Sequence, residues 1–146
     1  KIKTIKLFLI ILVLQILIAF FLNLLDTDFG EDSLENKSLV STFILVVIVA
    51  PVFETLIFNT LPVKIIQFFI KNKLTIILLS SFAFALIHTY SLAYLIMTYF
   101  GALGLNTFYL IEEERKGFFE AVGLTALMHS IYNLFGFLLI EIFHII

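Results

Sequence analysis

Long apolar runs separated by short polar segments dominate the chain. They cover residues 5–25, 39–70, 74–88, 92–111 and 118–143. A transmembrane helix needs roughly 20 predominantly apolar residues to cross ~30 Å of hydrocarbon. The chain shows no strand-like alternation of apolar and polar residues and no internal repeat. The pattern therefore predicts an all-α, polytopic transmembrane helix bundle of about five spans, forming a single integral-membrane domain over residues 1–146.

The breaks between the predicted helices are polar. Residues 26–37, DTDFGEDSLENK, are expected to form an acidic loop, and residues 112–117, EEERKG, a polar turn. The run 39–70 would be ~48 Å long as one continuous helix. Because that length exceeds an upright span, we expect a tilt, or a kink at Pro51 or Pro62.

Composition excludes a water-soluble fold. Of the 146 residues, 62% are hydrophobic and 14% are charged, whereas a soluble domain is about half apolar and about a quarter charged. The chain has no cysteine, which excludes disulfide frameworks, thiolate metal sites and cysteine nucleophiles. A formal net charge of −2 without a long basic stretch predicts no nucleic-acid partner. The expected surroundings are membrane lipid, and nothing in the sequence indicates an oligomeric state.

The cationic residues predict the orientation, because Lys and Arg in short loops are retained on the cytoplasmic side. Threading the helices alternately leaves Lys37 alone on one side of the membrane. The other eight cations fall on the opposite side: Lys1, Lys3, Lys6, Lys64, Lys71, Lys73, Arg115 and Lys116. We therefore expect a multi-pass protein with a cytoplasmic N-terminus and an outside C-terminus.

Three ionisable residues, Glu54, His88 and His129, lie deep inside predicted spans. Such groups are costly in lipid, so they usually face the protein interior and mark a function. At ~1.5 Å per residue they lie ~24, ~21 and ~18 Å from the cytoplasmic helix ends, which brings them to one level. Phe84 precedes His88 by four residues and Asn133 follows His129 by four, so each pair shares a helix face. A single such histidine could be a hydrogen-bonded interior residue, but the convergence favours a functional site.

These residues stand in three short motifs on successive predicted helices. The motifs are VAPVFETLIFN around Glu54, FALIH ending at His88, and HSIYN from His129 to Asn133. In order and spacing they resemble the CPBP (Abi) family of intramembrane proteases, over about residues 40–140. That family includes the CAAX prenyl proteases and bacteriocin-processing or bacteriocin-immunity membrane proteins.

The resemblance implies a role for each residue. Glu54 with His88 would activate a water for attack on a peptide carbonyl, and His129 with Asn133 would stabilise the oxyanion. A carboxylate and an imidazole can take a proton from water, and fixed donors aimed at an oxyanion can contribute several kcal/mol. The implied function is an intramembrane endopeptidase acting on a membrane-associated peptide or protein. The alternative is a proteolytically inactive immunity or scaffold protein; a transporter or channel is a distant third, since no paired repeat is present.

The first motif departs from the family's usual EExxxR. Thr55 stands at the second Glu position and Asn59 at the Arg position. An i, i+4 ion pair is thereby replaced by a neutral pair capable of hydrogen bonding, which avoids an unpaired charge in the membrane. We expect Thr55 and Asn59, with Phe84, to support the site without performing chemistry.

A metal is the remaining alternative for the chemistry. Glu54, His88 and His129 would make a ligand set that a catalytic zinc accepts, with an open fourth position, and the family is often grouped with the metalloproteases. The contiguous HExxH signature is absent from the sequence. We expect a metal-free site without a cofactor, and zinc on those three residues as the alternative.

Overall fold

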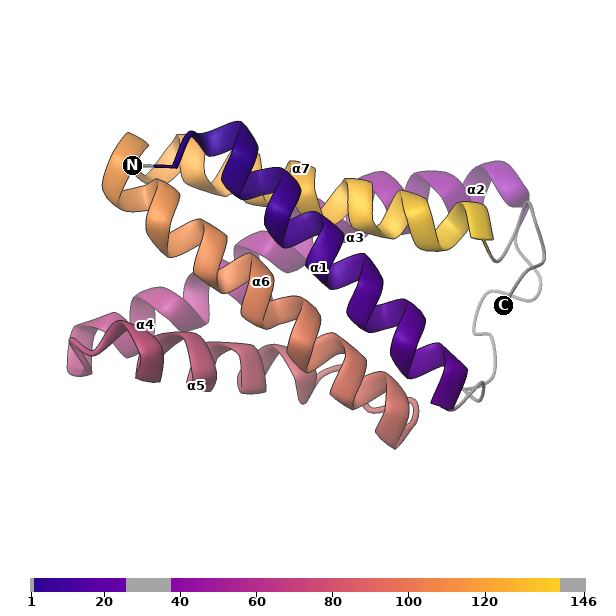
Figure 1. Ribbon diagram of the computed structural model, residues 1–146, viewed down its shortest axis with the longest axis horizontal. Helices are drawn as coiled ribbons and strands as arrows, with labels where there is room; N and C mark the ends of the chain where they lie inside the picture. The colour runs from indigo at the N-terminus through magenta and orange to yellow at the C-terminus, as the bar shows by residue number, and fades with distance from the viewer. Residues whose placement is uncertain (1, 26–37, 140–146) are drawn as a thin grey trace.

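The computed structural model describes residues 2–25 and 38–139 (Figure 1). Most of these residues are helical and none is in a strand, which confirms the predicted all-α helix bundle. The acidic loop predicted at 26–37 and the end of the last predicted helix, from 140 onward, lie outside the described residues. The elements are α1 (Thr4–Leu25), α2 (Leu39–Phe43), the π-helix η1 (Ile44–Val49), α3 (Ala50–Glu54), the π-helix η2 (Thr55–Thr60), α4 (Leu61–Phe69), α5 (Lys73–Ala85), α6 (Leu92–Lys116) and α7 (Phe118–Phe137).

Three of the described helices are long and apolar enough to cross a membrane. They cover Thr4–Leu22, Leu39–Phe69 and Leu92–Lys116. The other two predicted spans correspond to α5, an apolar helix of 13 residues, and α7, a helix of 20 residues with polar groups in its interior. The bundle therefore contains three candidate spans by length and composition, together with two further helices packed among them.

The long second apolar run forms one helical path with two wider turns. The segments from α2 to α4 follow each other without an interruption, and the π-helices η1 and η2 lie between the α-helical parts. Pro51 lies in the first turn of α3 and Pro62 in the first turn of α4. Proline has no N–H to donate, so the preceding turn loses a hydrogen bond. A π-helix precedes each proline: η1 lies before Pro51 and η2 before Pro62.

The predicted helix 74–88 is too long. The helix α5 ends at Ala85, and His88 lies in the turn that follows it. The His88 amide donates to the carbonyl oxygen of Ala85 at 2.9 Å, an i to i−3 bond that tightens the chain out of the α-helix. Ser91 then caps α6 by accepting from the amide of Tyr94. His88 is therefore placed by a turn and not by a helix face.

The predicted turn at 112–117 is wrong, because α6 continues through Lys116. Arg115 pairs with Glu112 three residues earlier, at 2.9 Å, and cations in the last turn suit the negative end of the helix dipole. Gly117 alone reverses the chain, with φ +88° and ψ 173°. That backbone region is open essentially to glycine only.

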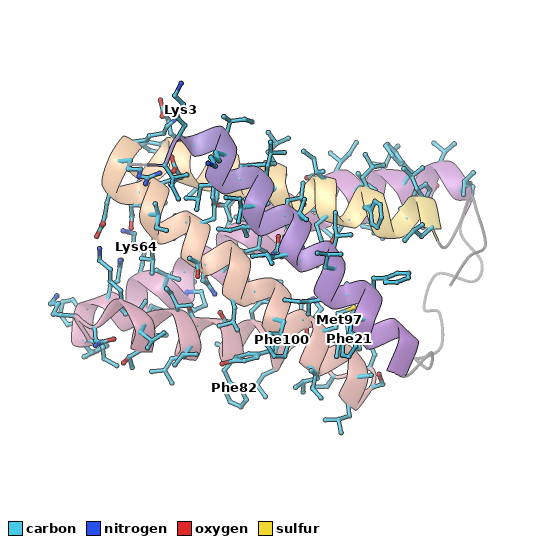
Figure 2. All side chains as sticks on the ribbon, viewed as in Figure 1. Lys3, Phe21, Lys64, Phe82, Met97 and Phe100 are labelled. Carbon is cyan, nitrogen blue, oxygen red and sulfur yellow. The ribbon has the colours of Figure 1, made fainter. Side chains whose placement is uncertain are left out.

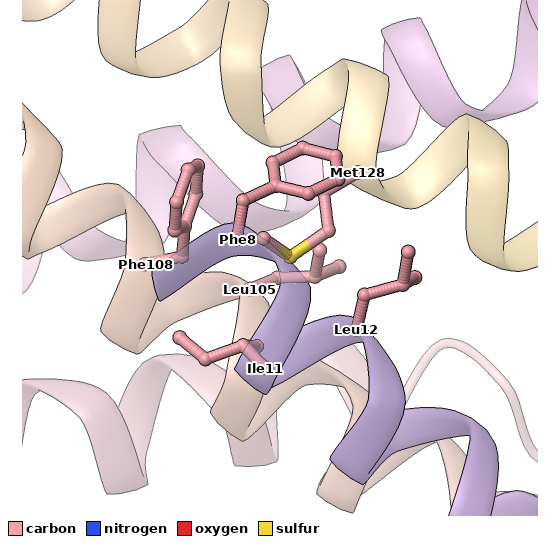
Figure 3. Packing of buried hydrophobic residues seen from close by; sticks show 6 residues of the cluster. All are labelled: Phe8, Ile11, Leu12, Leu105, Phe108 and Met128. Carbon is pink, nitrogen blue, oxygen red and sulfur yellow. The ribbon is translucent and has the colours of Figure 1, made fainter. Parts of the chain in front are cut away.

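Two apolar clusters hold the helices together. The α1 cluster joins α1, α6 and α7 (Figure 3) and consists of Phe8, Ile11, Leu12, Leu105, Phe108 and Met128. The α4 cluster joins α4, α5, α6 and α7 and consists of Val63, Ile76, Tyr109, Leu110 and Ala121. Together they fix how the helices that carry the three motifs meet.

Charged side chains gather at the end of the bundle that carries Lys3 and Lys64 (Figure 2). Lys64 forms an ion pair with Glu113, which also accepts from the hydroxyl of Tyr109 at 2.8 Å. The buried carboxylate of Glu112 accepts from Thr4 in α1 at 2.7 Å. These contacts tie α1, α4 and α6 together at one end, the end that the cation count predicts to be cytoplasmic.

Candidate active site

The three deep ionisable residues converge as predicted. Glu54 closes α3, and its Oε2 lies 3.5 Å from Nε2 of His129 in α7. The same oxygen lies 3.9 Å from Nε2 of His88. The carboxylate therefore stands between two imidazole rings that come from different elements. The Glu54 side chain is 24% exposed and those of His88 and His129 are 11% and 7% exposed, so Glu54 is the member of the group most open to the surroundings.

His88 is oriented by the backbone. Its Nδ1 lies 3.0 Å from the carbonyl oxygen of Phe84. A carbonyl only accepts, so Nδ1 carries the proton and a neutral ring presents its Nε2 lone pair to Glu54. The Phe84 ring stacks on the His88 ring with centroids 4.8 Å apart and touches His129 edge-on at 6.0 Å. Phe84 thus lies against both histidines, as expected of a supporting residue.

His129 contacts the first motif through both of its ring nitrogens. Its Nε2 faces Glu54, and its Nδ1 lies 3.4 Å from Oγ1 of Thr55. Both Thr55 and His129 are buried. When the Thr55 hydroxyl donates to Nδ1, the proton of a neutral ring is at Nε2, where it points toward the carboxylate.

The Asn133 side chain is held by the backbone of another helix. Its Nδ2 donates to the carbonyl oxygen of Val46 in η1 at 3.0 Å. In this π-helix the Ala50 amide donates to Leu45, and the next residue, Pro51, has no N–H. The Val46 carbonyl is therefore left without a helical donor, and Asn133 supplies one. The second N–H of the same amide stays available for another acceptor.

Asn59 does not pair with Thr55 as expected. The four-residue spacing assumed an α-helix, but the segment is the π-helix η2, and the Thr55 side chain turns to His129. Asn59 is fully buried, and within the described part of the chain neither its Nδ2 nor its Oδ1 has a hydrogen-bond partner. It therefore forms no hydrogen bond with either histidine.

Tyr94 is a residue at the site that sequence reasoning missed. Its ring lies 6.0 Å from that of His88 and 5.2 Å from that of Tyr90. Tyrosine gives little signal in a chain with 18 Phe and 5 Tyr residues. The sequence does indicate Tyr94 by its position. Tyr94 lies in the first turn of the helix that follows His88 after a short break, so it must lie close to that histidine.

The described side chains do not form a set of ligands arranged for zinc. Across the described residues, no group of three or more His, Asp or Glu side chains is arranged to hold a metal ion. Glu54, His88 and His129 are close to one another, but they do not form such a group. The preference for a metal-free site stays a prediction, and the chemistry below uses only the side chains of this chain.

Comparison with protein families matches residues 36–135 to the family described as type II CAAX prenyl endopeptidase Rce1-like. The matched segment contains Glu54, His88, His129 and Asn133. The chain belongs to this family. Comparisons with curated proteins and with solved structures found no match.

Membership of the Rce1-like family confirms the resemblance found in the three motifs. Together with the three apolar helices, it identifies the chain as an integral membrane protein. The orientation of the termini stays a prediction. The family is one of proteases, so peptidase chemistry is the general activity associated with this family. The helix α1 precedes the matched segment and packs against it through the α1 cluster.

Proposed function

We propose that this chain is an intramembrane endopeptidase that cleaves a membrane-associated peptide, with a prenylated C-terminal peptide as the first substrate class to test. The observation that carries the proposal is the Glu54 carboxylate between two imidazole nitrogens, at 3.5 and 3.9 Å, in the interior of a membrane helix bundle. Ionisable side chains are costly to place inside a membrane, so such a cluster usually marks a functional site. The name of the family supports prenylated peptides as substrates.

The proposed reaction begins with a water between Glu54 and His88. The separation of 3.9 Å exceeds a direct hydrogen bond, and both facing atoms are acceptors when His88 is neutral. One water can donate to both. Glu54 accepts a proton as the water oxygen attacks the peptide carbonyl carbon. The proton then passes to the leaving amine, the C–N bond breaks, and the products are a carboxylic acid and an amine.

The proposed oxyanion donors are His129 and Asn133. Thr55 favours the tautomer of His129 with its proton on Nε2, and the Val46 carbonyl fixes the Asn133 amide so that its second N–H is free to donate. Donors fixed before the reaction stabilise the developing charge without reorganisation. These residues would therefore act mainly in the transition state.

The test is cleavage in liposomes of a peptide with a farnesylated C-terminal cysteine motif, beside the same peptide without the lipid. We expect turnover of the lipidated peptide, unaffected by a zinc chelator, and none by Glu54→Gln. Asn133→Ala should lower kcat with little change in substrate affinity. Undiminished cleavage by Asn133→Ala would contradict the oxyanion role.

Failure of the unmutated chain to cleave a broad set of membrane peptides, while it still binds one of them, would instead support an inactive immunity or scaffold protein. In that case Asn133→Ala should weaken binding itself. Inhibition by the chelator, reversed by added zinc, would support the metal alternative.

A further inference from the structure

The α4 cluster shows which residues of α4, α5, α6 and α7 lie at the same level along the bundle. One member from each helix contributes to it: Val63, Ile76, Leu110 and Ala121. Residues four positions apart on a helix lie on the same face, about 6 Å apart along the axis. One turn nearer to the candidate active site, the same four helical paths present four polar residues: Asn59, Ser80, Asn106 and Thr125. All four are fully buried. With the adjacent buried residues Thr60 and Ser81, they form what we call the polar layer.

Part of the polar layer is hydrogen-bonded. Ser80 and Thr125 each donate to a backbone carbonyl of their own helix at 2.7 Å. The Asn106 amide donates to Oγ of Ser81 at 2.9 Å, which joins α6 to α5 at this level. The bond between Asn106 and Ser81 therefore shows that polar side chains of α5 and α6 meet at this level.

The rest of the layer has unmatched polar atoms. Within the described residues, five buried side-chain nitrogen or oxygen atoms lack a hydrogen-bond partner, and four of these belong to the layer. They are Nδ2 and Oδ1 of Asn59, Oγ1 of Thr60 and Oδ1 of Asn106. Unmatched buried polar atoms are rare in proteins, and each one that occurs needs an explanation such as an internal water or an ion.

The ability of these four atoms to donate or accept hydrogen bonds indicates which ligand would match them. Nδ2 of Asn59 can only donate, the two amide oxygens can only accept, and the hydroxyl of Thr60 can do either. A cation would satisfy the oxygens but would leave the Asn59 amide N–H groups unmatched. Water both donates and accepts, and an internal water makes about three hydrogen bonds.

We propose that the polar layer is an internal water-binding site, in which Asn59, Thr60 and Asn106 bind water between the α4 cluster and Glu54. Asn59 follows Glu54 by five residues, and η2 is a π-helix, in which five residues make about one turn. Thr125 precedes His129 by one α-helical turn. The layer is thus one turn from the carboxylate, and the α4 cluster closes it on its other side with apolar side chains.

The site also has a functional consequence, which rests on the proposed endopeptidase activity. Each hydrolysis consumes one water at Glu54, and this water must be replaced before the next turnover. Water held one turn away in the polar layer replaces it.

A single introduced thiol tests for the water. The chain has no cysteine, so Asn59→Cys gives one S–H stretching band in the infrared spectrum. Val63→Cys is the matched control, because Val63 and Asn59 are one turn apart and both are 0% exposed. After transfer into D₂O, we expect the thiol of Asn59→Cys to exchange on the order of tenfold faster than that of Val63→Cys. We also expect its band to shift to lower frequency through hydrogen bonding. Equal exchange and equal frequency in the two variants would overturn the water-binding site.

A second pair of variants covers the case in which Asn59→Cys does not fold. Asn106→Cys and Leu110→Cys stand one turn apart on α6, in the polar layer and in the α4 cluster. The same difference in exchange supports the site, and its absence contradicts it.

The supply of water to Glu54 is tested separately from the binding of water. In a chain that cleaves peptide, Asn59→Leu should lower kcat severalfold and leave KM unchanged, because the substrate does not contact the layer. An unchanged kcat would overturn the supply of water from the layer. Thiol exchange needs no catalysis, so a chain that cleaves nothing would contradict the proposed function and leave the water-binding site to be decided by the infrared result.

Discussion

At the scale of single residues, Glu54 is the centre of the arrangement. Its Oε2 faces both histidines, and those histidines are in turn fixed by the Phe84 carbonyl and by Thr55. A group that takes a proton from water must be ionisable, whereas a group that orients a histidine needs only a hydrogen bond. The two kinds of residue should therefore differ strongly on substitution.

Glu54→Gln should reduce turnover by about 100-fold or more, because the amide cannot accept the proton of water. Thr55→Val removes one long hydrogen bond to His129 and should cost about fivefold, equivalent to ~1 kcal/mol. The measurement is kcat on a lipidated peptide, at equal expression and equal melting temperature in detergent. Equal losses from both changes would show that these roles are wrongly assigned.

Asn133 bonds to the Val46 carbonyl and is also proposed to stabilise the oxyanion. A substitution at Pro51 distinguishes the structural role from the catalytic one. Asn133→Ala should lower the free energy of unfolding by about 1–3 kcal/mol, because the partly buried Val46 carbonyl loses its donor. Pro51→Ala restores an N–H at the position from which a π-helix would bond Val46. We therefore expect Pro51→Ala to recover stability in the Asn133→Ala background.

The double variant Asn133→Ala, Pro51→Ala also tests the oxyanion role of Asn133. If Asn133 also stabilises the oxyanion, activity should stay low after stability is restored. Recovery of both stability and kcat would leave Asn133 with a purely structural role.

At the scale of helices, the junction between α6 and α7 consists of one residue. Gly117 ends α6 and begins α7 with a positive φ, and its position decides where the HSIYN motif starts along the bundle. Because α7 follows without a loop, a change at this junction should shift His129 relative to Glu54.

Gly117→Ala should lower the free energy of unfolding by about 1–3 kcal/mol, since a Cβ disfavours this backbone region. Gly123→Ala is the matched control, because Gly123 lies inside α7 and an added Cβ meets nothing within 4 Å. It should be neutral or stabilising by about 0.5–1 kcal/mol. Thermal unfolding in detergent measures both, and equal melting temperatures for the two variants would contradict the strain at Gly117.

At the scale of the whole molecule, α1 is attached to the matched segment by a polar contact as well as by the α1 cluster. The buried side chain of Gln15 donates to the carbonyl oxygen of Gly101 at 2.6 Å. It crosses α6 at Gly104, where an added Cβ would lie 2.9 Å from Cδ and Nε2 of Gln15. Gly104 therefore permits the close approach of α1 that small residues between membrane helices provide, and Gly101 contributes its carbonyl oxygen.

Gly104→Val should displace Gln15 and loosen α1, at a cost of about 1–3 kcal/mol in unfolding free energy. Gly101→Ala is the control, because nothing lies within 4 Å of its added Cβ. Protease susceptibility of α1 and the melting temperature report the effect. A Gly104→Val protein as stable and as protected as Gly101→Ala would contradict this account of how α1 is attached.

The sequence by itself determined the class of molecule, the motifs and the level at which they meet. Hydropathy is a local property, and a bilayer accepts few backbone structures, so apolar runs suffice to predict a helix bundle. A helix rises by a fixed amount per residue, so counting residues placed Glu54, His88 and His129 at one depth before any contact was known.

Only the tertiary structure decided what each of these side chains touches. The bond from Asn133 to Val46 joins two helices that are distant in sequence. The end of α5 before His88 and the π-helices beside the prolines are departures from a regular α-helix that residue spacing does not reveal. The same holds for the contact between Thr55 and His129 and for the unmatched atoms of Asn59. Spacing along a chain fixes which face of a regular helix a residue occupies. It cannot say when a turn widens or which neighbouring helix lies opposite, because those are settled by packing between helices.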